Sequence, residues 1–225
     1  NRVWQQLRLI DYLNHMPVVQ ILENGTEADD VISYISQLPE FQGSQKVIVS
    51  SDKDFFQLCD EETIIYRPIK EEFINSNRII KEYNIHPINF ALARSIVGDR
   101  SDSISGIKGS GLLTVGKRFP FLSENRHYNI TDLINYSKAQ ENKIKLYQDI
   151  LNSEELIEKN YKLTQLYIPT MSVQSKTMIK HIVMNATNKD NLSFSKFVIQ
   201  KMMMEDGIAS YDWSTLFLYC NKLCS

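Results

Sequence analysis

The sequence predicts an α/β fold in which a parallel sheet is followed by a helical subdomain. Two observations lead to this prediction: strand-length apolar runs alternate with helical patterns up to Asn75, and from Ser76 onward the strand signals fade while amphipathic helical patterns dominate. Strands that alternate with helices pair in parallel and are covered on both faces. With 225 residues, 43% of them hydrophobic, the chain can bury one such core and carry an appended subdomain.

The front half reads as alternating helices and strands. Apolar positions recur at near-helical spacing over residues 3–15, and Val18–Leu22 then predicts a buried strand. The compact run within Lys46–Ser50 is typical of a central parallel strand, and Thr63–Tyr66 predicts another short one. Sites gather at the carboxyl ends of parallel strands, so we expect the loops after the first two strands to lie side by side.

The back half is predicted to be helical. Pro87–Val97 and Ala139–Leu151 carry the clearest amphipathic patterns. We therefore divide the chain into a nuclease-type core at residues 1–94, a hairpin-containing region at 95–140 and a helical carboxy-terminal region at 141–225.

The formal net charge of −2 conceals an asymmetry along the chain. Residues 1–60 carry four Lys/Arg against nine Asp/Glu, whereas the remainder has a small basic excess, with 21 basic and 18 acidic residues. An acidic front half joined to a basic back half suits an enzyme that holds metal ions with one part and DNA phosphates with the other.

The cysteines and the lengths of the apolar runs indicate the cellular compartment that we expect for the protein. Cys59, Cys220 and Cys224 form no CxxC pair, which indicates reduced thiols in an intracellular compartment. The longest apolar runs fall far short of the roughly 20 residues that a membrane-spanning helix needs. The four histidines are scattered along the sequence, and we interpret them as structural.

The first acidic cluster is Glu27-Ala28-Asp29-Asp30, placed at the start of a predicted helix. Thr26 is the expected N-cap, so the helix should begin at Glu27. Acids in the first turn of a helix are stabilised by its macrodipole, and that is the alternative explanation for this cluster taken alone.

Two further acidic pairs lie at element boundaries. Asp52 and Asp54 follow the strand at Lys46–Ser50, and Asp99 and Asp102 lie in a glycine-led loop after the helix that ends near Val97. Each pair alone could be a solvated loop. Three short-spaced clusters together favour a divalent-metal site, and ligation by oxygen alone selects Mg²⁺ or Mn²⁺ over zinc.

The segment Ser105–Leu112 is rich in glycine and lies between two apolar helical patterns. Glycines permit positive φ and close backbone approach, so backbone amides can point at a phosphate. The segment therefore predicts an anion-binding hairpin, with an ordinary tight turn as the alternative. A dinucleotide-binding loop is excluded because the glycines do not fall as GxGxxG and no strand precedes them.

The three motifs resemble those of the flap endonuclease family in order and separation. They read Glu-Ala-Asp-Asp, then Ser-Ser-Asp-Lys-Asp-Phe, then Gly-Asp-Arg-Ser-Asp-Ser-Ile-Ser-Gly-Ile-Lys-Gly-Ser-Gly. The family includes bacteriophage 5′ nucleases and the 5′ nuclease domain of bacterial DNA polymerase I. The resemblance runs from Val18 to Phe119, and it implies a partial PIN-like core joined to a helix-three-turn-helix subdomain.

The resemblance also implies roles for the acids. Glu27 and Asp29 match ligands of a first metal ion, with Asp30 in its inner or outer sphere, and the other four acids match ligands of a second ion. The metal set is Glu27, Asp29, Asp30, Asp52, Asp54, Asp99 and Asp102, of which Asp29, Asp52 and Asp54 are assigned to catalysis. Two ions about 4 Å apart could activate a water and stabilise the departing 3′ oxygen. We interpret Lys53 as a charge-balancing residue.

The hairpin is similar to the part of the family fold that grips duplex DNA and often holds K⁺. The DNA-binding residues it implies are Gly106, Lys108, Gly109, Ser110, Gly111, Thr114, Lys117 and Arg118. In two places the hairpin departs from the family pattern, because Ser110 stands where an aliphatic residue is usual and Leu113 where Lys is common. The expected partners are flap, nicked or primer-bearing DNA, and RNA–DNA hybrid.

Other features expected of the family are not found in the sequence. They are two amino-terminal Asp residues and a basic helical arch, so we expect the chain to begin partway through the enzyme, with the amino-terminal segment truncated, cleaved or encoded separately. The predicted function is a Mg²⁺-dependent structure-specific 5′ nuclease in the cytoplasm of a bacterial or phage-infected cell. The alternatives are a non-catalytic duplex-DNA-binding module and a PIN-like nuclease for single-stranded RNA.

Overall fold

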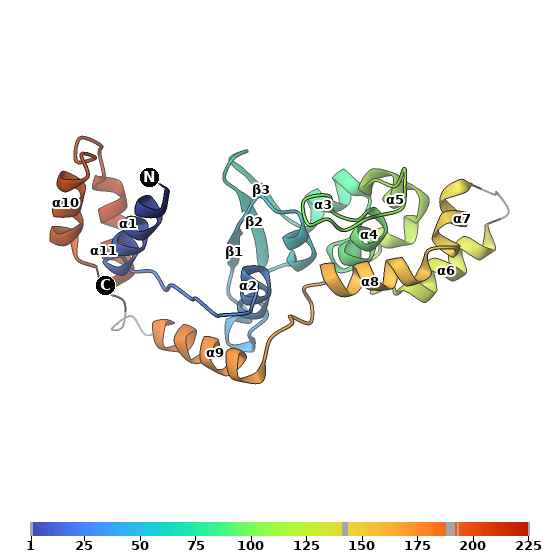
Figure 1. The fold of residues 1–225 in the computed structure, drawn as a ribbon, viewed down its shortest axis with the longest axis horizontal. Coiled ribbons are helices and arrows are strands. Elements are labelled where there is room, and N and C mark those ends of the chain that lie inside the picture. The colour runs from blue at the N-terminus through green and yellow to red at the C-terminus, as the bar shows by residue number, and fades with distance from the viewer. Residues whose placement is uncertain (1, 141–143, 188–191, 193, 225) are drawn as a thin grey trace. The chain divides into compact units, whose positions relative to one another are not determined.

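The computed structural model describes residues 2–140, 144–187, 192 and 194–224 (Figure 1). The chain forms two compact units. The terminal unit combines Asn1–Gly25 with Met171–Ser225, and the central unit is Thr26–Thr170. No helix in the described part of the chain is long and apolar enough to cross a membrane.

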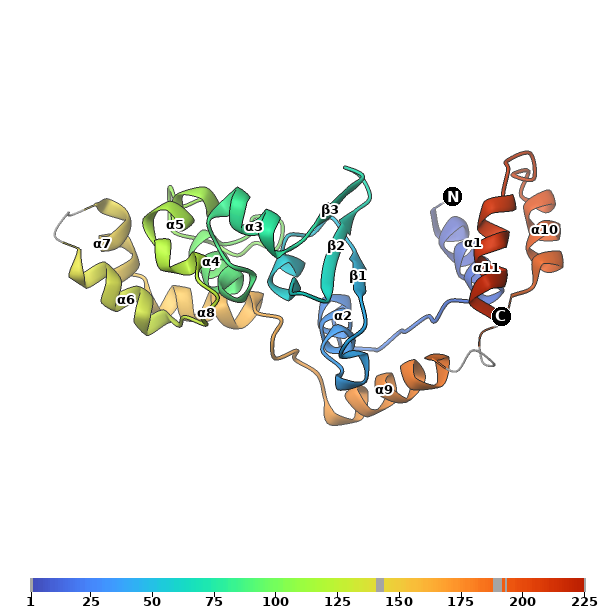
Figure 2. The same cartoon turned by 180° about the vertical axis from the view of Figure 1, so that it is seen from behind.

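The terminal unit is helical. Its helices are α1 (Arg2–Asn14), α9 (Val173–Thr187), α10 (Lys196–Glu205) and α11 (Ser214–Cys224). The helix predicted over residues 3–15 is confirmed as α1. In both views α1, α10 and α11 lie side by side (Figures 1 and 2). The methionines at 202–204 lie in α10, where Met202 and Met203 are buried and Met204 is exposed.

The two ends of the chain meet within this unit through a small apolar cluster and an ion pair. Ile199, Met203 and Phe217 form the cluster, and Tyr12 packs against it. Arg8 on α1 donates from Nε to Asp206 across 2.7 Å, and the Tyr12 hydroxyl donates to the same carboxylate across 2.8 Å. The sequence alone pairs no residue of α1 with α10, because these partners are almost 200 positions apart.

The sheet of the central unit has three strands in the order β1-β2-β3. β1 (Lys46–Val49) and β2 (Thr63–Arg67) are parallel, and β3 (Glu72–Ile74) runs antiparallel to β2. The register aligns Ile48, Ile65 and Ile74 in one row, and all three are buried. Since side chains alternate between the faces of a strand, this row defines the core face of the sheet.

The structure corrects the predicted strands in three respects. Val18–Leu22 forms no strand and is not buried, since Val18, Val19 and Leu22 are all exposed. β1 is an edge strand of the described sheet rather than a central one, and β3 was not predicted. An apolar run indicates burial but does not identify a ladder partner, so periodicity alone cannot decide whether such a run joins a sheet.

Helices form most of the central unit. In chain order they are α2 (Ala28–Ser36), η1 (Pro39–Phe41), η2 (Asp54–Leu58), α3 (Ser76–Tyr83), η3 (Pro87–Asn89), α4 (Phe90–Val97), α5 (Leu112–Arg118), η4 (Pro120–Ser123), α6 (Ile130–Ala139), α7 (Lys145–Leu151) and α8 (Glu154–Thr164). Of these, α3 to α8 lie on one side of the sheet (Figure 2). α4 packs against α8, α5 and η2, and every residue of α4 except Val97 is buried. The helix expected to end near Val97 is confirmed.

Two predicted helix boundaries shift. Glu27 is the N-cap of α2 and the helix begins at Ala28, one residue later than predicted. The pattern Ala139–Leu151 is not one helix, because α6 ends at Ala139 and α7 begins at Lys145. Residues 141–143 lie outside the described residues. The domain boundaries at 94/95 and 140/141 stay a prediction.

Candidate metal centre

Three segments of the central unit bring the acidic motifs together. Asp29 lies in the first turn of α2, which packs against η2. Asp54 is the first residue of η2, and Asp99 follows α4, which also packs against η2. The predicted convergence of the first two acidic loops is therefore correct. Its structural cause is the packing of α2 on η2, and the strand expected at Val18–Leu22 has no part in it.

The turn before η2 fixes Asp52 and Asp54 at different depths. The Asp52 carboxylate accepts a hydrogen bond from the Asp54 backbone N–H at 2.9 Å, and the Asp52 N–H donates to the Ser50 hydroxyl at 3.0 Å. Asp52 is exposed, whereas Asp54 is only 8% exposed. Lys53 Nζ lies 5.5 Å from the centre of the Tyr83 ring.

The loop after α4 is closed by its backbone. Asp99 and Ile104 form an isolated antiparallel bridge through two hydrogen bonds of 2.8 and 2.7 Å. Gly98 has φ +72°, and a Cβ there would lie 2.4 Å from the backbone nitrogen of Gly106. A Cβ on Gly106 would lie 1.8 Å from the Val97 carbonyl oxygen. Glycine is therefore required at both positions for the loop to close and present Asp99 and Asp102.

Arg94 lies behind the acidic cluster and links two of its members. Its Nε donates to Asp54 Oδ1 at 2.5 Å, its Nη2 donates to Asp99 Oδ2, and its Nη1 donates to the Gly98 carbonyl at 3.2 Å. The side chain is 9% exposed. This residue was not predicted to belong to the site. The available signal was a single arginine within the otherwise uncharged helix Phe90–Val97, four residues before Gly98.

Asp54, Asp99 and Asp102 each offer one carboxylate oxygen within 4.8 Å of the others. This is the one group of three or more possible His, Cys, Asp or Glu metal ligands among the described residues. Because all the donors are carboxylate oxygens, the group fits a hard divalent ion such as Mg²⁺.

The charges of the cluster act on Asp29 as well. Burial, together with the negative charges of Asp52 and Asp54, then those of Glu27 and Asp102, raises the pKa of Asp29 to about 6. Residues from all three motifs therefore share one electrostatic environment. The unfavourable free energy of this crowding is what a bound cation would offset.

Two members of the cluster differ in how their own charge is balanced. Burial raises the pKa of Asp54, and the hydrogen bond and charge of Arg94 offset part of that rise. Burial also acts to raise the pKa of Asp99, but hydrogen bonds from Ser101 and Arg94 outweigh it and lower the pKa to about 2. Asp99 is thus held ionised by the protein itself, whereas Asp54 has only partial compensation.

Glu27 and Asp30 are placed differently from Asp29. Glu27 is exposed at the N-cap of α2 and makes no side-chain capping hydrogen bond. Asp30 Oδ1 accepts the backbone N–H of Thr170 at 3.0 Å, which ties α2 to the end of the central unit. The structure thus gives Asp30 a structural partner and leaves Glu27 at the surface near the cluster.

Buried amides hold the site segments from behind. Gln57 donates to the carbonyls of Asp54 and Thr164 at 2.8 and 2.9 Å and accepts the Leu166 N–H at 2.7 Å. Asn160 donates to the carbonyls of Ser95 and Ser105 at 2.9 and 2.8 Å, so α8 fixes both ends of the loop that carries Asp99. Sequence analysis missed both amides, because isolated Gln and Asn residues in helical patterns are usually exposed.

The predicted hairpin lies between α4 and α5. Ile107 donates its N–H to the Ile96 carbonyl at 2.8 Å, and Gly109 has φ +82°. The Ser110 hydroxyl contacts the carbonyls of Ile107 and Ile96 at 2.6 and 3.2 Å, so this side chain holds the hairpin shut. Gly111 is the N-cap of α5.

The remaining predicted DNA-binding residues lie on the outside of this hairpin and of α5. Lys108, Thr114 and Lys117 are exposed, and Arg118 is half-buried. Leu113, where the family commonly has Lys, is 65% exposed. The structure therefore presents three basic side chains from the hairpin and α5, and the loop with Asp99 and Asp102 directly precedes the hairpin in the chain.

The fold and this site define a class of protein, namely an α/β protein of PIN-like fold with a carboxylate site and a helix–hairpin–helix element. The fold is similar to that of a mutant of the bacteriophage T5 5′-exonuclease, with a TM-score of 0.56 and 21% identity over 84% of this chain and 69% of that one. A complex of the bacteriophage T5 flap endonuclease with DNA and metal ions gives a TM-score of 0.57, with 21% identity over 85% of this chain and 62% of that one.

Sequence comparison leads to the same group of proteins. Residues 2–84 match the model of the 5′-3′ exonuclease N-terminal resolvase-like domain. A 5′-3′ exonuclease of Aquifex aeolicus is 26% identical over 196 residues, which is 79% of this chain and 66% of that protein. The thermostable DNA polymerase I of Thermus filiformis is 33% identical over 104 residues, or 46% of this chain and 12% of the polymerase.

These findings show that the chain is similar to 5′-3′ exonucleases and, in its fold, to a bacteriophage flap endonuclease. The chain spans just under two thirds of the Aquifex relative, and 39% of a Buchnera 5′-3′ exonuclease to which it is 32% identical over 112 residues, or 46% of this chain. The resemblance found in the three sequence motifs is confirmed.

Proposed function

We propose that this protein is a structure-specific 5′ nuclease that hydrolyses phosphodiesters of branched or nicked DNA with divalent metal ions. The observation that carries the proposal is the convergence of Asp29, Asp52, Asp54 and Asp102 in one electrostatic cluster, in the same compact unit as the hairpin. The names of the relatives, which are 5′-3′ exonucleases and a flap endonuclease bound to DNA and metal ions, support it.

The residues present fit a divalent-metal site. Asp54 and Asp102 would hold one ion together with Asp52, and Asp29 would contribute toward a second, with Glu27 nearby. When bound, the ions would supply a water of lowered pKa and charge stabilisation for the departing oxygen. We propose Mg²⁺ or Mn²⁺ as the ions, two per complete site, and K⁺ at the hairpin.

The protein's own residues would bind and orient the substrate. Lys108, Lys117 and Arg118 would neutralise phosphates of the duplex, and the backbone around Gly109 and Gly111 would approach the strand closely. The substrates we propose are flaps, nicks and RNA primers annealed to DNA. The proposal includes the bacterial or phage-infected cytoplasm as the place of action.

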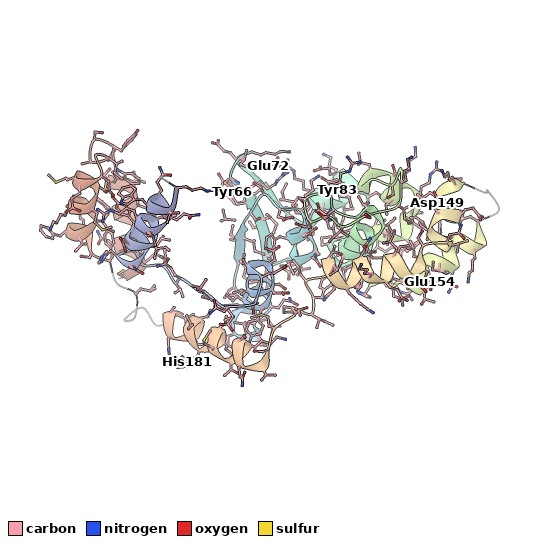
Figure 3. The ribbon with its side chains drawn as sticks, viewed as in Figure 1. Tyr66, Glu72, Tyr83, Asp149, Glu154 and His181 are labelled. Carbon is pink, nitrogen blue, oxygen red and sulfur yellow. The ribbon has the colours of Figure 1, made fainter. Side chains whose placement is uncertain are left out.

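Cleavage of 5′-labelled flap DNA tests the proposal. With Mg²⁺ we expect cleavage that EDTA abolishes, and we expect Asp52→Asn combined with Asp102→Asn to slow it at least about 1000-fold, because metal ligation accounts for several kcal/mol of the barrier reduction. Glu154→Gln is the matched control, since Glu154 is exposed at the start of α8 (Figure 3).

The same assay separates the alternatives. A non-catalytic module would bind duplex DNA equally well in EDTA and show no cleavage with Mg²⁺. Undiminished cleavage by the double variant would overturn the roles assigned to the acids. Preferential cleavage of single-stranded RNA would favour the other PIN-like function.

A further inference from the structure

Arg94 is a cation built into a cluster that otherwise carries only acids. It extends from α4, where Phe90, Ala93 and Ile96 are almost fully buried, and its own side chain is 9% exposed. Arginine stays protonated at any physiological pH, and such a charge is rarely buried without partners. Its burial therefore depends on the two carboxylates that it contacts.

The hydrogen bonds show which carboxylate oxygens Arg94 occupies. Asp99 uses both oxygens within the protein: Oδ2 accepts from Arg94, and Oδ1 accepts the Ser101 N–H at 2.7 Å and the Ser101 hydroxyl. Asp54 uses Oδ1 for Arg94. Within the described residues, no hydrogen bond is found to Asp54 Oδ2 or to the carboxylate of Asp102. In the described part of the chain, Asp54 Oδ2 and both oxygens of Asp102 are thus free of protein hydrogen bonds, whereas both oxygens of Asp99 already accept hydrogen bonds.

Charge explains why this arrangement has consequences for metal binding. Two carboxylates at hydrogen-bonding distance from one guanidinium are held together without any metal ion. A divalent ion bound beside them is repelled by the same guanidinium, and that repulsion is large in a partly desolvated site. Arg94 thus stabilises the acids before metal binds and opposes the metal when it arrives.

We infer that Arg94 is the resident counter-ion of the carboxylate cluster, a positioning residue that occupies the gap between Asp54 and Asp99 and directs the divalent ion to the edge formed by Asp54 and Asp102. The inference rests on the proposed function only in assigning the cluster to a divalent ion. It makes Asp99 a residue that orients Arg94, and it weakens divalent-ion binding so that occupancy responds to the ion concentration.

A purely structural role for Arg94 predicts the opposite change in metal affinity when the residue is replaced. If Arg94 only organised the acids, its loss would disorder the ligands and weaken metal binding. If Arg94 is the counter-ion, removal of its charge relieves repulsion and strengthens metal binding. The sign of the change in metal affinity therefore distinguishes the two roles.

The affinity for Mn²⁺ can be measured by titration without DNA at low ionic strength, in which the electron paramagnetic resonance signal reports the concentration of free Mn²⁺. We expect Arg94→Gln to bind Mn²⁺ about tenfold more tightly than the wild type. Arg94→Lys keeps the charge, and its affinity should stay within about threefold of wild type. Arg78→Gln is the matched control, because Arg78 is exposed and pairs with Glu72 away from the cluster.

A second measurement covers the case in which Arg94→Gln folds poorly. In EDTA this variant should have a lower melting temperature than wild type, and saturating Mn²⁺ should recover most of the loss. If Arg94→Gln cannot be titrated, the Mn²⁺ affinity of Arg94→Lys distinguishes the two roles. A structural role depends on the two-pronged hydrogen bonding of the guanidinium, which Lys lacks, so it predicts that Arg94→Lys binds Mn²⁺ more weakly than the wild type.

Unchanged or weaker Mn²⁺ binding by Arg94→Gln would overturn the inference, and so would the absence of Mn²⁺ binding by the wild type. Flap cleavage by the wild type, measured in parallel, keeps the two proposals apart. Cleavage without an affinity change in Arg94→Gln contradicts only the counter-ion role. An affinity change without cleavage contradicts only the nuclease function.

Discussion

The two ends of η2 carry buried polar side chains that differ in how well their surroundings satisfy them. Gln57, near its end, is 2% exposed, and its amide is fully hydrogen-bonded to backbone groups. Asp54, at its start, is nearly as buried, yet it shares its surroundings with other acids and has a raised pKa. The polar group of Gln57 is satisfied by hydrogen bonds within the protein, whereas the negative charge around Asp54 is only partly balanced by Arg94.

This contrast distinguishes scaffold from site. Buried amides such as Gln57 and Asn160 stabilise the native state because every polar group finds a partner. Buried acids that repel one another cost stability and are retained where their charge has a use. Variants in the amide network should therefore lose stability equally with and without Mg²⁺, whereas variants in the acid cluster should depend on the ion.

Gly106→Ala should have the largest effect on stability, because the loop it closes joins both regions. Its Cβ would lie 1.8 Å from the Val97 carbonyl oxygen, so we expect a loss of about 3 kcal/mol or more in the free energy of unfolding. Urea unfolding measures the loss, and Mg²⁺ should not restore it. Gly111→Ala, which meets no atom within 4 Å, should lose far less. Equal losses in the two variants would contradict the close approach.

Asn160→Ala should have the next largest effect. It leaves the buried carbonyl of Ser95 and the partly buried carbonyl of Ser105 without this donor, which costs about 2 kcal/mol in the free energy of unfolding. The same loss in EDTA and in Mg²⁺ would show that the amide belongs to the scaffold. Lys159→Ala, an exposed neighbour on α8, should change stability by no more than about 0.5 kcal/mol. A loss that Mg²⁺ abolishes would place Asn160 with the acids instead.

Asp29→Asn should have the smallest effect, and its sign should depend on pH. The pKa of Asp29 is raised to about 6 in the folded state from the ordinary 3.8. Ionisation of Asp29 therefore destabilises the native state progressively as the pH rises from 3.8 to about 6, fully above pH 6 and not at all below pH 3.8. In EDTA we expect the variant to be more stable than wild type by about 1 kcal/mol at pH 8, after allowance for solvent screening, and equal to it at pH 3.5.

The same substitution tests the coupling between motifs. Since the Asp52 charge contributes to the raised pKa, the gain from Asp29→Asn should shrink in an Asp52→Asn background. Fluorescence-monitored urea unfolding of the four proteins completes the double-mutant cycle. Strictly additive effects would mean that the two motifs do not share one environment.

Sequence patterns could predict much of this fold. Helices such as α1 and α4 follow from apolar spacing, and β1 and β2 follow from short β-branched runs. The strand expected at Val18–Leu22 shows the limit, because its apolar run found no ladder partner. β3 is three residues long and its signal was too short to detect.

The candidate site, like the fold, contains residues that the sequence could predict and residues that it could not. Short-range spacing within each motif was enough to single out the acids, because carboxylates repeated at element boundaries are informative locally. The contacts of Arg94 with Asp54 and of Asn160 with Ser95 could not be predicted, because these partners are 40 and 65 residues apart and only the packing of α4 against η2 and α8 brings them together. Asp30 was grouped with its neighbours by sequence, yet its carboxylate binds Thr170.

Crystallographic location of Mn²⁺ by its anomalous scattering tests the central claim most directly, because it shows which carboxylates meet at an ion. We predict a peak within coordination distance of Asp54 and Asp102, with Asp52 or Asp29 beside it and Arg94 still bound to Asp99. A peak elsewhere, or the absence of Mn²⁺ from these acids in crystals soaked at saturating concentration, would contradict the account.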